Sequence, residues 1–339
     1  MRASAAIYGC LGPRLGAEEI AFFRDVRPWG FILFARNIEG PDQVRGLVSA
    51  LRETVGREDA PILIDQEGGR VQRFGPPHWR KYPPARVLAN LPGGPAARRE
   101  AARLGARLMA DDLRALGVNV DCAPVLDVPQ PGAHDIIGDR AYGETPEAVA
   151  VFGRAVAEGL LAGGVLPVIK HIPGHGRATS DSHFDLPVVE ATAEALRQTD
   201  FAPFQALSDM PMAMTAHVLY RTLDPRRPAT TSRRVIQGVL RAELGFSGLI
   251  LSDDLSMKAL DGDMTQRARR SLSAGCDVVL HCNGDMAEMK AVAAGAGLLS
   301  GTAARRAEVA LARIPRRPEP LDRREAEARF DALLAGAQA

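Results

Sequence analysis

The sequence is poor in cysteine, lysine and aromatic residues, and it carries almost no net charge. Its 339 residues include four cysteines, none of them in a CxxC pair, so neither a disulfide framework nor a cysteine-rich zinc site is expected. Aromatic residues make up only 5%, which argues against a base-stacking platform, and the net charge of +1 provides no field that attracts nucleic acid or an anionic membrane. Nucleic acids and membranes are therefore not expected partners.

Long apolar segments are also missing. No run reaches the ~18 apolar residues that a transmembrane helix needs. The stretch that ends at Cys10 faintly resembles a lipoprotein cleavage site, but only residues 3–6 precede it, whereas a signal peptide needs an apolar stretch of ~7–15 residues. We therefore expect residues 7–10 to belong to a first core strand, and we expect a cytoplasmic protein with reduced thiols.

What the sequence does contain is a regular alternation between short apolar runs and longer segments of helical periodicity. Continuous apolar runs without polar alternation are typical of parallel strands that are buried on both faces. Such runs occur at residues 5–10, 31–34, 61–65, 118–121, 165–170, 212–217, 249–252 and 276–280.

The segments between these runs have helix signals. Thr145 is a good N-cap in front of Pro146, and Gly245 suits the end of a later helix. The helices expected on this basis cover residues 17–26, 42–53, 146–161 and about 232–244.

Eight such alternations favour the α/β class and a closed (β/α)8 barrel of the TIM type over a doubly wound open sheet. No GxGxxG motif follows the first run, which weakens a dinucleotide-binding version of the open sheet. The sequence has no evident linker. We therefore expect one barrel domain over residues 1–339, with a helical tail at about residues 300–339.

Polar residues follow several of the predicted strands. Enzymes with this barrel keep their chemistry at the C-terminal ends of the strands, and a cluster of buried unpaired charges would be costly without a function. Each residue alone still has a structural explanation, such as a cap, an ion pair or a satisfied buried histidine. The cluster comprises Asp65, Glu67, Arg70, Arg73, Asp121, Asp127, Lys170, His171, His175, Asp181, His183, His217, Asp253, Asp254, His281 and Asn283.

Two chemistries can use this cluster. Metal-assisted hydrolysis would take His171, His175, His183, His217 and an aspartate as ligands. Glycoside hydrolysis would use one carboxylate to attack the sugar and a second group to protonate the leaving oxygen. Metal-assisted hydrolysis is disfavoured because the first strand has no His-X-His, and because a Pro-Gly pair keeps the first two of these histidines off a common helix face.

Residues 170–183, KHIPGHGRATSDSH, closely resemble a hallmark of the glycoside hydrolase family 3 β-N-acetylhexosaminidases, the single-domain type used in peptidoglycan recycling. The resemblance extends over about residues 5–285, and Ile172, where the family more often has Phe, changes packing and not chemistry. Further segments agree in the expected order: residues 64–73 (IDQEGGRVQR), 123–128 (APVLDV), 137–143 (IGDRAYG), 214–218 (MTAHV) and 248–257 (GLILSDDLSM).

The resemblance implies the catalytic residues. Asp253 would be the nucleophile, with Asp254 as its rival because strand parity alone does not separate the two. The acid/base would be His183 of the Asp-X-His motif, with Asp181 as its partner. An imidazole suits this role because its ordinary pKa of ~6.5 lies near the operating pH, and a neighbouring carboxylate orients the ring. The Pro and Gly content of residues 173–176 predicts a mobile loop that brings the histidine to the sugar.

The resemblance also implies the substrate contacts. His175 and His217 would be residues of the pocket wall or behind it, and no metal, nucleotide or other cofactor is implied. The sugar would be held by Asp65, Arg73, Arg140, Lys170 and His171.

The resulting hypothesis is a retaining exo-β-N-acetylglucosaminidase for a small carbohydrate substrate. It would remove terminal GlcNAc from cytoplasmic muropeptides, chiefly GlcNAc-β-1,4-anhydro-MurNAc with or without peptide, in cell-wall recycling. A phosphorylase of the same fold is a close rival, because a neutral imidazole repels phosphate less than a carboxylate does. Three more distant hypotheses are catalysis by the substrate's own acetamide, a metal-dependent amidohydrolase and an inactive sugar-binding protein.

Overall fold

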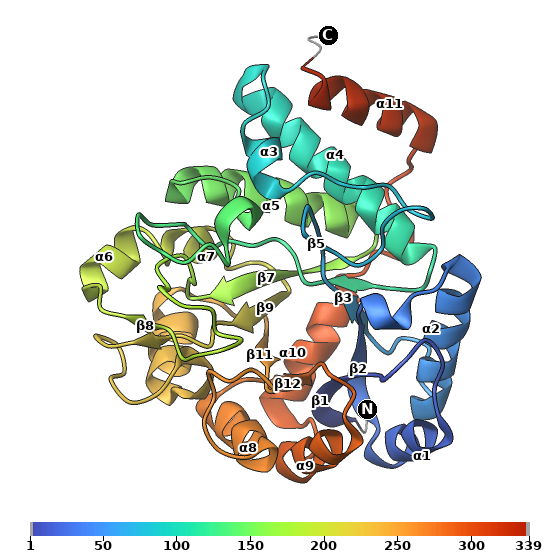
Figure 1. Cartoon of the computed structure of the whole chain (residues 1–339), viewed down its shortest axis with the longest axis vertical. Coiled ribbons are helices and arrows are strands. Elements are labelled where there is room, and N and C mark those ends of the chain that lie inside the picture. Colours follow the sequence, from blue (N-terminus) through green and yellow to red (C-terminus); the bar gives the residue numbers. More distant parts are fainter. Residues whose placement is uncertain (1–2, 337–339) are drawn as a thin grey trace.

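The computed structural model describes residues 3–336, which form a closed barrel of eight parallel strands surrounded by helices (Figure 1). Neighbours in the barrel follow the order of the chain, so each strand leads through a crossover to the next one. The barrel predicted from the sequence is confirmed, and each predicted run overlaps one strand. The strands are β1 (Ser4–Gly9), β2 (Pro28–Leu33), β3 (Ile62–Ile64), β6 (Val120–Asp121), β7 (Leu166–Ile172), β9 (Met212–Thr215), β11 (Leu249–Asp254) and β12 (Val278–His281).

Helices cover the outside of the barrel. The cap predicted at Thr145 is present, since its hydroxyl accepts a hydrogen bond of 3.3 Å from the Ala148 amide. The helix predicted at about residues 232–244 is a π-helix, η4. The helices are α1 (Ala17–Val26), α2 (Pro41–Val55), α3 (Ala85–Ala89), α4 (Gly94–Arg114), α5 (Pro146–Ala162), α6 (Ala193–Gln198), α7 (Ala202–Ala206), η4 (Arg234–Glu243), α8 (Met264–Ala274), α9 (Met286–Ala296), α10 (Gly301–Ala312) and α11 (Arg323–Leu334). No helix within residues 3–336 has the length and apolar character needed to cross a bilayer.

Two small sheets lie in the connections beyond the barrel. An antiparallel hairpin joins β4 (Gln66–Gly68) to β5 (Val71–Gln72), and β8 (Val188–Val189) pairs in parallel with β10 (Leu219–Tyr220). A Cβ atom at Gly68 would lie 2.4 Å from the Pro83 carbonyl oxygen, so only glycine fits this turn of the hairpin. Strands of two or three residues have no measurable period, and the sequence did not predict either sheet.

Apolar side chains from every strand fill the interior of the barrel. They are fully or almost fully buried, as the unbroken apolar runs predicted. This cluster includes Ile7, Ile32, Leu63, Val120, Val168, Met214, Leu251 and Val278. It forms a solid floor beneath the C-terminal ends of the strands.

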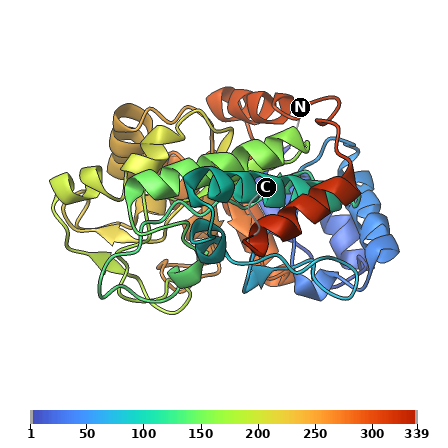
Figure 2. The same cartoon turned by 90° about the horizontal axis from the view of Figure 1, so that it is seen from above.

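The tail contributes two helices with different contacts. In α10, Ala307 and Ala310 join the apolar cluster of the barrel interior, at the end of the barrel where β1 begins. α11 lies along α4 (Figure 1, Figure 2), where Phe330 is fully buried against Gly105 and Arg323 bridges to the Asp112 carboxylate at 2.7 Å. The three C-terminal residues of the predicted tail, like residues 1 and 2, lie outside the described part of the chain.

Removal of the Phe330 ring tests whether α11 stabilises the barrel. Phe330→Ala leaves a cavity between α11 and α4, and large-to-small changes of a buried Phe cost roughly 3–5 kcal/mol in the free energy of unfolding. Urea unfolding monitored by circular dichroism measures this difference. Phe184→Ala is the matched control, because Phe184 is exposed and its loss should cost roughly 0.5 kcal/mol or less. Equal stability of the two variants would show that α11 is not part of the folded unit.

Candidate active site

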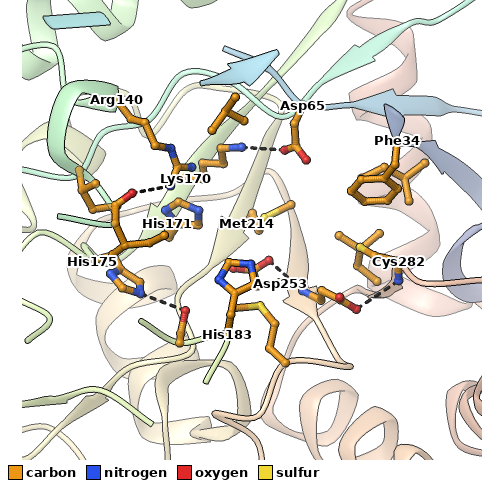
Figure 3. A pocket seen from close by; sticks show the side chains of 18 of the residues that line it. Phe34, Asp65, Arg140, Lys170, His171, His175, His183, Met214, Asp253 and Cys282 are labelled. Carbon is orange, nitrogen blue, oxygen red and sulfur yellow. Dashed lines mark hydrogen bonds and ion pairs between the residues drawn. The ribbon is translucent and has the colours of Figure 1, made fainter. Parts of the chain in front are cut away.

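A pocket opens at the C-terminal ends of the strands (Figure 3). Its volume of about 200 Å³ is below the ~300–1,000 Å³ of typical small-molecule sites, so it is a small pocket. Apolar walls come from Phe34, Met214, Met257 and Leu280. The polar lining consists of Asp65, Arg73, Arg140, Lys170, His171, His175, Ser182, His183, Asp253 and Asp254. The structure therefore gathers all the predicted site residues around one pocket, with Asp181 in contact with His183 and not in the lining itself.

An irregularity in β7 places two consecutive residues in the pocket. Lys170 pairs with Met214, but Ile172 pairs with the next residue, Thr215, so β7 carries one extra residue at His171. A bulge of this kind turns a side chain that would otherwise point away from the barrel. Lys170 and His171 consequently both face the pocket, although neighbours in a regular strand face opposite sides.

Lys170 is the centre of a buried network of charges. Its ammonium nitrogen lies 2.9 Å from Asp65 Oδ1 and 2.7 Å from Glu67 Oε1. Arg73 donates to the other oxygen of Asp65 at 3.0 Å, and Arg140 donates to both oxygens of Glu67 at 2.8 Å. Each cation of the network is thus held by at least one carboxylate, and Arg140 forms the bidentate pair that a guanidinium favours.

These contacts fix the charges of the network. Burial acts to raise the pKa of Glu67, but the Arg140 guanidinium and the Lys170 ammonium outweigh it and hold this pKa at about 2. Burial also opposes ionisation of Asp65, and the same lysine together with Arg73 brings its pKa below the ordinary value. Burial acts to lower the pKa of Lys170, but the two carboxylates outweigh it and raise this pKa. The pocket therefore presents fixed anions and cations, which can accept from and donate to the hydroxyls of a sugar.

Asp127 orients His171. Its Oδ2 atom lies 2.7 Å from His171 Nδ1, and its Oδ1 atom accepts from the backbone amides of His171 and His175 at 3.2 and 2.6 Å. Asp127 is fully buried, and these partners keep its pKa below the ordinary value in spite of that burial. The hydrogen-bond pattern assigns the proton to Nδ1, which leaves His171 Nε2 to the pocket.

The structure distinguishes the two neighbouring aspartates of β11. An irregularity between Leu251 and Asp254 in the pairing with β12 brings both carboxylates to the pocket. The carboxylate of Asp254 is engaged by the amides of Ser256 and Cys282, each at 3.1 Å, and also by the Ser256 hydroxyl. Asp253 accepts one hydrogen bond within the described chain, from the Asp254 amide at 2.8 Å. Asp254 therefore has a structural role, while Asp253 is available for chemistry.

Asp253 is held as an anion. Burial acts to raise its pKa, but the imidazoles of His171 and His217 counter this effect and the pKa of Asp253 lies below its ordinary value. His217 is fully buried, with Nδ1 at 2.7 Å from the Thr230 hydroxyl and Nε2 at 3.0 Å from the Asp254 carbonyl oxygen. His217 is thus a satisfied buried histidine that supports the end of β11.

His183 and Asp181 form a pair at the mouth of the pocket. His183 Nδ1 lies 2.7 Å from Asp181 Oδ1, and the same oxygen accepts from the His183 backbone amide at 2.9 Å. The His183 side chain is 60% exposed, and it lines the same pocket as Asp253 (Figure 3). Burial acts to raise the pKa of Asp181, and the hydrogen bonds from His183 lower it below the ordinary value. The pair can therefore hold a proton on the ring and pass it to a bound molecule.

The four histidines of the metal hypothesis are directed to other partners. His171 contacts Asp127, His175 contacts Ser182, His183 contacts Asp181 and His217 contacts Thr230. Within residues 3–336, no three His, Cys, Asp or Glu side chains form a group with the geometry of a metal site.

Two residues of this site had no role assigned from the sequence. Glu67 and Asp127 were visible as polar residues after strands, but neither acts on the pocket directly. Glu67 follows Asp65 by two positions, and residues two apart in an extended chain point to the same side, so the spacing was a signal that the two carboxylates lie together. Its partnership with Arg140 joins segments 73 residues apart, which no local pattern reveals.

The charge network predicts a pH-dependent loss of stability in Glu67→Gln. The folded-state pKa of Glu67 is about 2, below its ordinary 4.5, so its contribution is fully present above pH 4.5 and disappears as the pH falls towards 2. We expect the free energy of unfolding of the variant to be roughly 1–3 kcal/mol below that of the wild type at pH 7, with a smaller difference at pH 3.5. Urea titrations at both values measure it.

Glu58→Gln is the control, because Glu58 is exposed and lies outside the network. The same amide substitution there should leave the stability unchanged at both pH values. A Glu67→Gln deficit that does not shrink at low pH would contradict the assigned charge state.

Comparison with known proteins agrees with this geometry. The model of the glycosyl hydrolase family 3 N-terminal domain matches residues 18–316. A β-hexosaminidase of Methylococcus capsulatus is 43% identical over 281 residues, or 82% of each chain, and one of Alkalilimnicola ehrlichii is 42% identical over 81% of this chain and 79% of its own. NagZ from Neisseria gonorrhoeae, solved in complex with N-trifluoroacetyl-D-glucosamine, superposes with a TM-score of 0.86 at 31% identity, covering 100% of this chain and 99% of its own. The chain therefore belongs to glycosyl hydrolase family 3, and by its similarity to these proteins it is a glycoside hydrolase.

Proposed function

We propose that this glycoside hydrolase is a retaining exo-β-N-acetylglucosaminidase in which Asp253 is the nucleophile and His183 the acid/base. The observation that carries the proposal is the pairing, in one pocket, of a carboxylate that is free of strong partners with an exposed imidazole that is oriented by Asp181. Retention requires a nucleophile and a proton donor on either side of the glycosidic bond.

The first step transfers the sugar to the enzyme. The Asp253 carboxylate forms a bond to the anomeric carbon while the bond from that carbon to the glycosidic oxygen breaks. His183, protonated at the start, gives its proton to the departing oxygen. In the second step the neutral imidazole takes a proton from water, whose oxygen displaces Asp253 and releases the sugar. Two displacements at one carbon return the original β configuration.

The surroundings support both roles. The lowered pKa of Asp253 keeps it anionic, as a nucleophile needs, and its single hydrogen bond leaves lone pairs free. Asp181 orients the His183 ring through Nδ1, so that Nε2 is the atom that exchanges the proton. A histidine paired with a carboxylate replaces the second carboxylic acid that most glycosidases use.

The charged network binds the sugar. Asp65 and the free Nε2 atom of His171 accept hydrogen bonds from hydroxyls, while Lys170, Arg73 and Arg140 donate to them, because these groups line the pocket. Their charges are fixed by the partners described above, so the site is organised before the sugar arrives and binding requires little rearrangement.

The substrate class follows from the relatives. The similar proteins are named β-hexosaminidases, and the Neisseria structure holds an N-acylated glucosamine. We extend these names to a terminal GlcNAc, carried by cytoplasmic muropeptides of the GlcNAc-β-1,4-anhydro-MurNAc type, with or without peptide, during cell-wall recycling. This substrate needs a pocket for one sugar, in keeping with the size of the site.

A trapped intermediate tests the proposal. A fluorinated N-acetylglucosaminide that forms its ester quickly and releases it slowly should label the wild-type protein at a ratio of one per chain. We expect peptide mass spectrometry to place the label on Asp253, because its carboxylate is the less engaged of the two.

Asp254→Asn and Asp253→Asn provide the comparison. The first retains the labelled carboxylate and should still be trapped if it folds, whereas the second should give no adduct. A label on Asp254 would overturn the assignment of the nucleophile. No adduct in an active wild-type enzyme would favour catalysis by the substrate's own acetamide.

A further inference from the structure

The residue between the two members of the acid/base pair faces the opposite way. Ser182 is 3% exposed, whereas the neighbouring His183 side chain is 60% exposed. The Ser182 hydroxyl lies 3.2 Å from His175 Nε2. Of residues 179–185 in the described chain, Ser182 is the one whose side chain hydrogen-bonds to a residue outside that segment. The catalytic segment is therefore tied to the barrel by a serine that takes no part in the chemistry.

The partner of this serine is firmly held. His175 is buried, and its backbone amide donates to Asp127 at 2.6 Å, the same carboxylate that orients His171. Burial lowers the pKa of His175 to about 4, so its ring is neutral near pH 7 and forms an ordinary hydrogen bond with a hydroxyl. A Cβ atom at Gly176 would lie 2.0 Å from the Val128 carbonyl oxygen, which shows how closely this stretch packs on its neighbour.

Close packing gives a second reason for the glycines of this stretch. A Cβ atom at Gly174 would lie 2.9 Å from Asp200 Cβ. Residues 174–176 are thus closely packed against Asp200 and Val128 at the start of the loop that leads to His183. The other side of this segment is held by two backbone hydrogen bonds, from the Ala259 amide to the Ser182 carbonyl at 3.3 Å and from the Lys258 amide to the His183 carbonyl at 3.4 Å. The Lys258 ammonium also lies over the exposed Phe184 ring, 5.9 Å from its centroid. These two backbone hydrogen bonds are long. The contact with His175 is the one side-chain hydrogen bond that joins residues 179–185 to the rest of the described chain.

We propose that Ser182 and His175 form a latch that holds His183 over the glycosidic oxygen, so that Ser182 is a positioning residue for acid/base catalysis. The inference rests on the proposed role of His183 as the proton donor. Loss of the latch leaves the nucleophile and the sugar contacts intact, because Asp253 lies on β11 and Lys170 on β7, outside the segment that carries Ser182. It reduces only the fraction of molecules in which the imidazole is docked.

This reasoning predicts a dependence on the leaving group. An aglycone that is a strong acid, such as dinitrophenol, departs as an anion and needs no proton, whereas an alkyl alcohol or a second sugar departs only with one. Loss of the docked imidazole should therefore slow the substrates with poor leaving groups and spare the activated ones. A purely structural defect would slow all of them alike.

The experiment compares Ser182→Ala with wild type by kcat/KM on a series of β-N-acetylglucosaminides. The aglycones are dinitrophenyl, nitrophenyl, phenyl and methyl. A lost hydrogen bond of ordinary strength should reduce kcat/KM roughly three- to tenfold for the phenyl and methyl substrates. For the dinitrophenyl substrate the change should stay within about twofold, because protonation contributes little there.

Ser180→Ala is the matched control. It makes the same chemical change two residues away, at a serine whose hydroxyl has no hydrogen-bond partner among the described residues, and it should behave as wild type throughout the series. Equal effects of Ser180→Ala and Ser182→Ala, or an equal loss on all four aglycones, would overturn the latch.

His175→Leu removes the other half of the contact and serves if Ser182→Ala does not fold. It should show the same leaving-group pattern, and the double variant should lose no more than either single one. His183→Ala separates the latch from the proposed function, since it must itself be most impaired on poor leaving groups. If it is not, the acid/base assignment fails; if it is while Ser182→Ala is not, only the latch fails.

Discussion

Lys170 lies buried at the end of β7, with its ammonium group between the carboxylates of Asp65 and Glu67. This interaction joins β7 to two connections of the barrel, because Asp65 and Glu67 both lie in the connection after β3, and Arg140 reaches Glu67 from the segment before α5. A buried cation is tolerated only with such partners, and removal of one carboxylate leaves its neighbours uncompensated. The position of these charged groups in the pocket therefore depends on a set of charges that balance one another away from bulk water.

Hydrogen-bond partners also determine which atoms of the histidines and aspartates face the pocket. His171 is held by Asp127, and His183 by Asp181, in both cases through Nδ1, so each ring presents its other nitrogen to the pocket. Asp254 accepts from the amide and hydroxyl of Ser256 in the adjoining turn and from the Cys282 amide after β12, whereas Asp253 accepts a single hydrogen bond within the described chain. Hydrogen bonds around the pocket thus determine which nitrogen and oxygen atoms are left free to face it.

The sequence predicts the barrel well because its signal is redundant. Eight unbroken apolar runs separated by helical segments indicate buried parallel strands, and polar residues at the ends of those runs then meet at one rim. Strand irregularities were not predictable in this way. The extra residue at His171 and the shift before Asp254 each reverse the expected facing of a side chain, and neither leaves a mark in the local pattern.

Long-range partners were equally hidden. Glu67 and Asp127 are ordinary acidic residues in the sequence, and their roles appear only when Arg140 and His171 are brought beside them. For the same reason the sequence left the choice between Asp253 and Asp254 to a family resemblance, whereas their hydrogen bonds give a physical reason for it. The roles of the site residues themselves are proposals that chemistry has to test.

The central claim is a double displacement through Asp253 with a proton supplied by His183. Proton NMR of the first product released from GlcNAc-β-1,4-anhydro-MurNAc, recorded in phosphate buffer before mutarotation, tests it most directly. The account predicts free GlcNAc that appears first as the β anomer. Initial formation of the α anomer would contradict a covalent intermediate, and GlcNAc-1-phosphate in place of the free sugar would show that phosphate, and not water, completes the reaction.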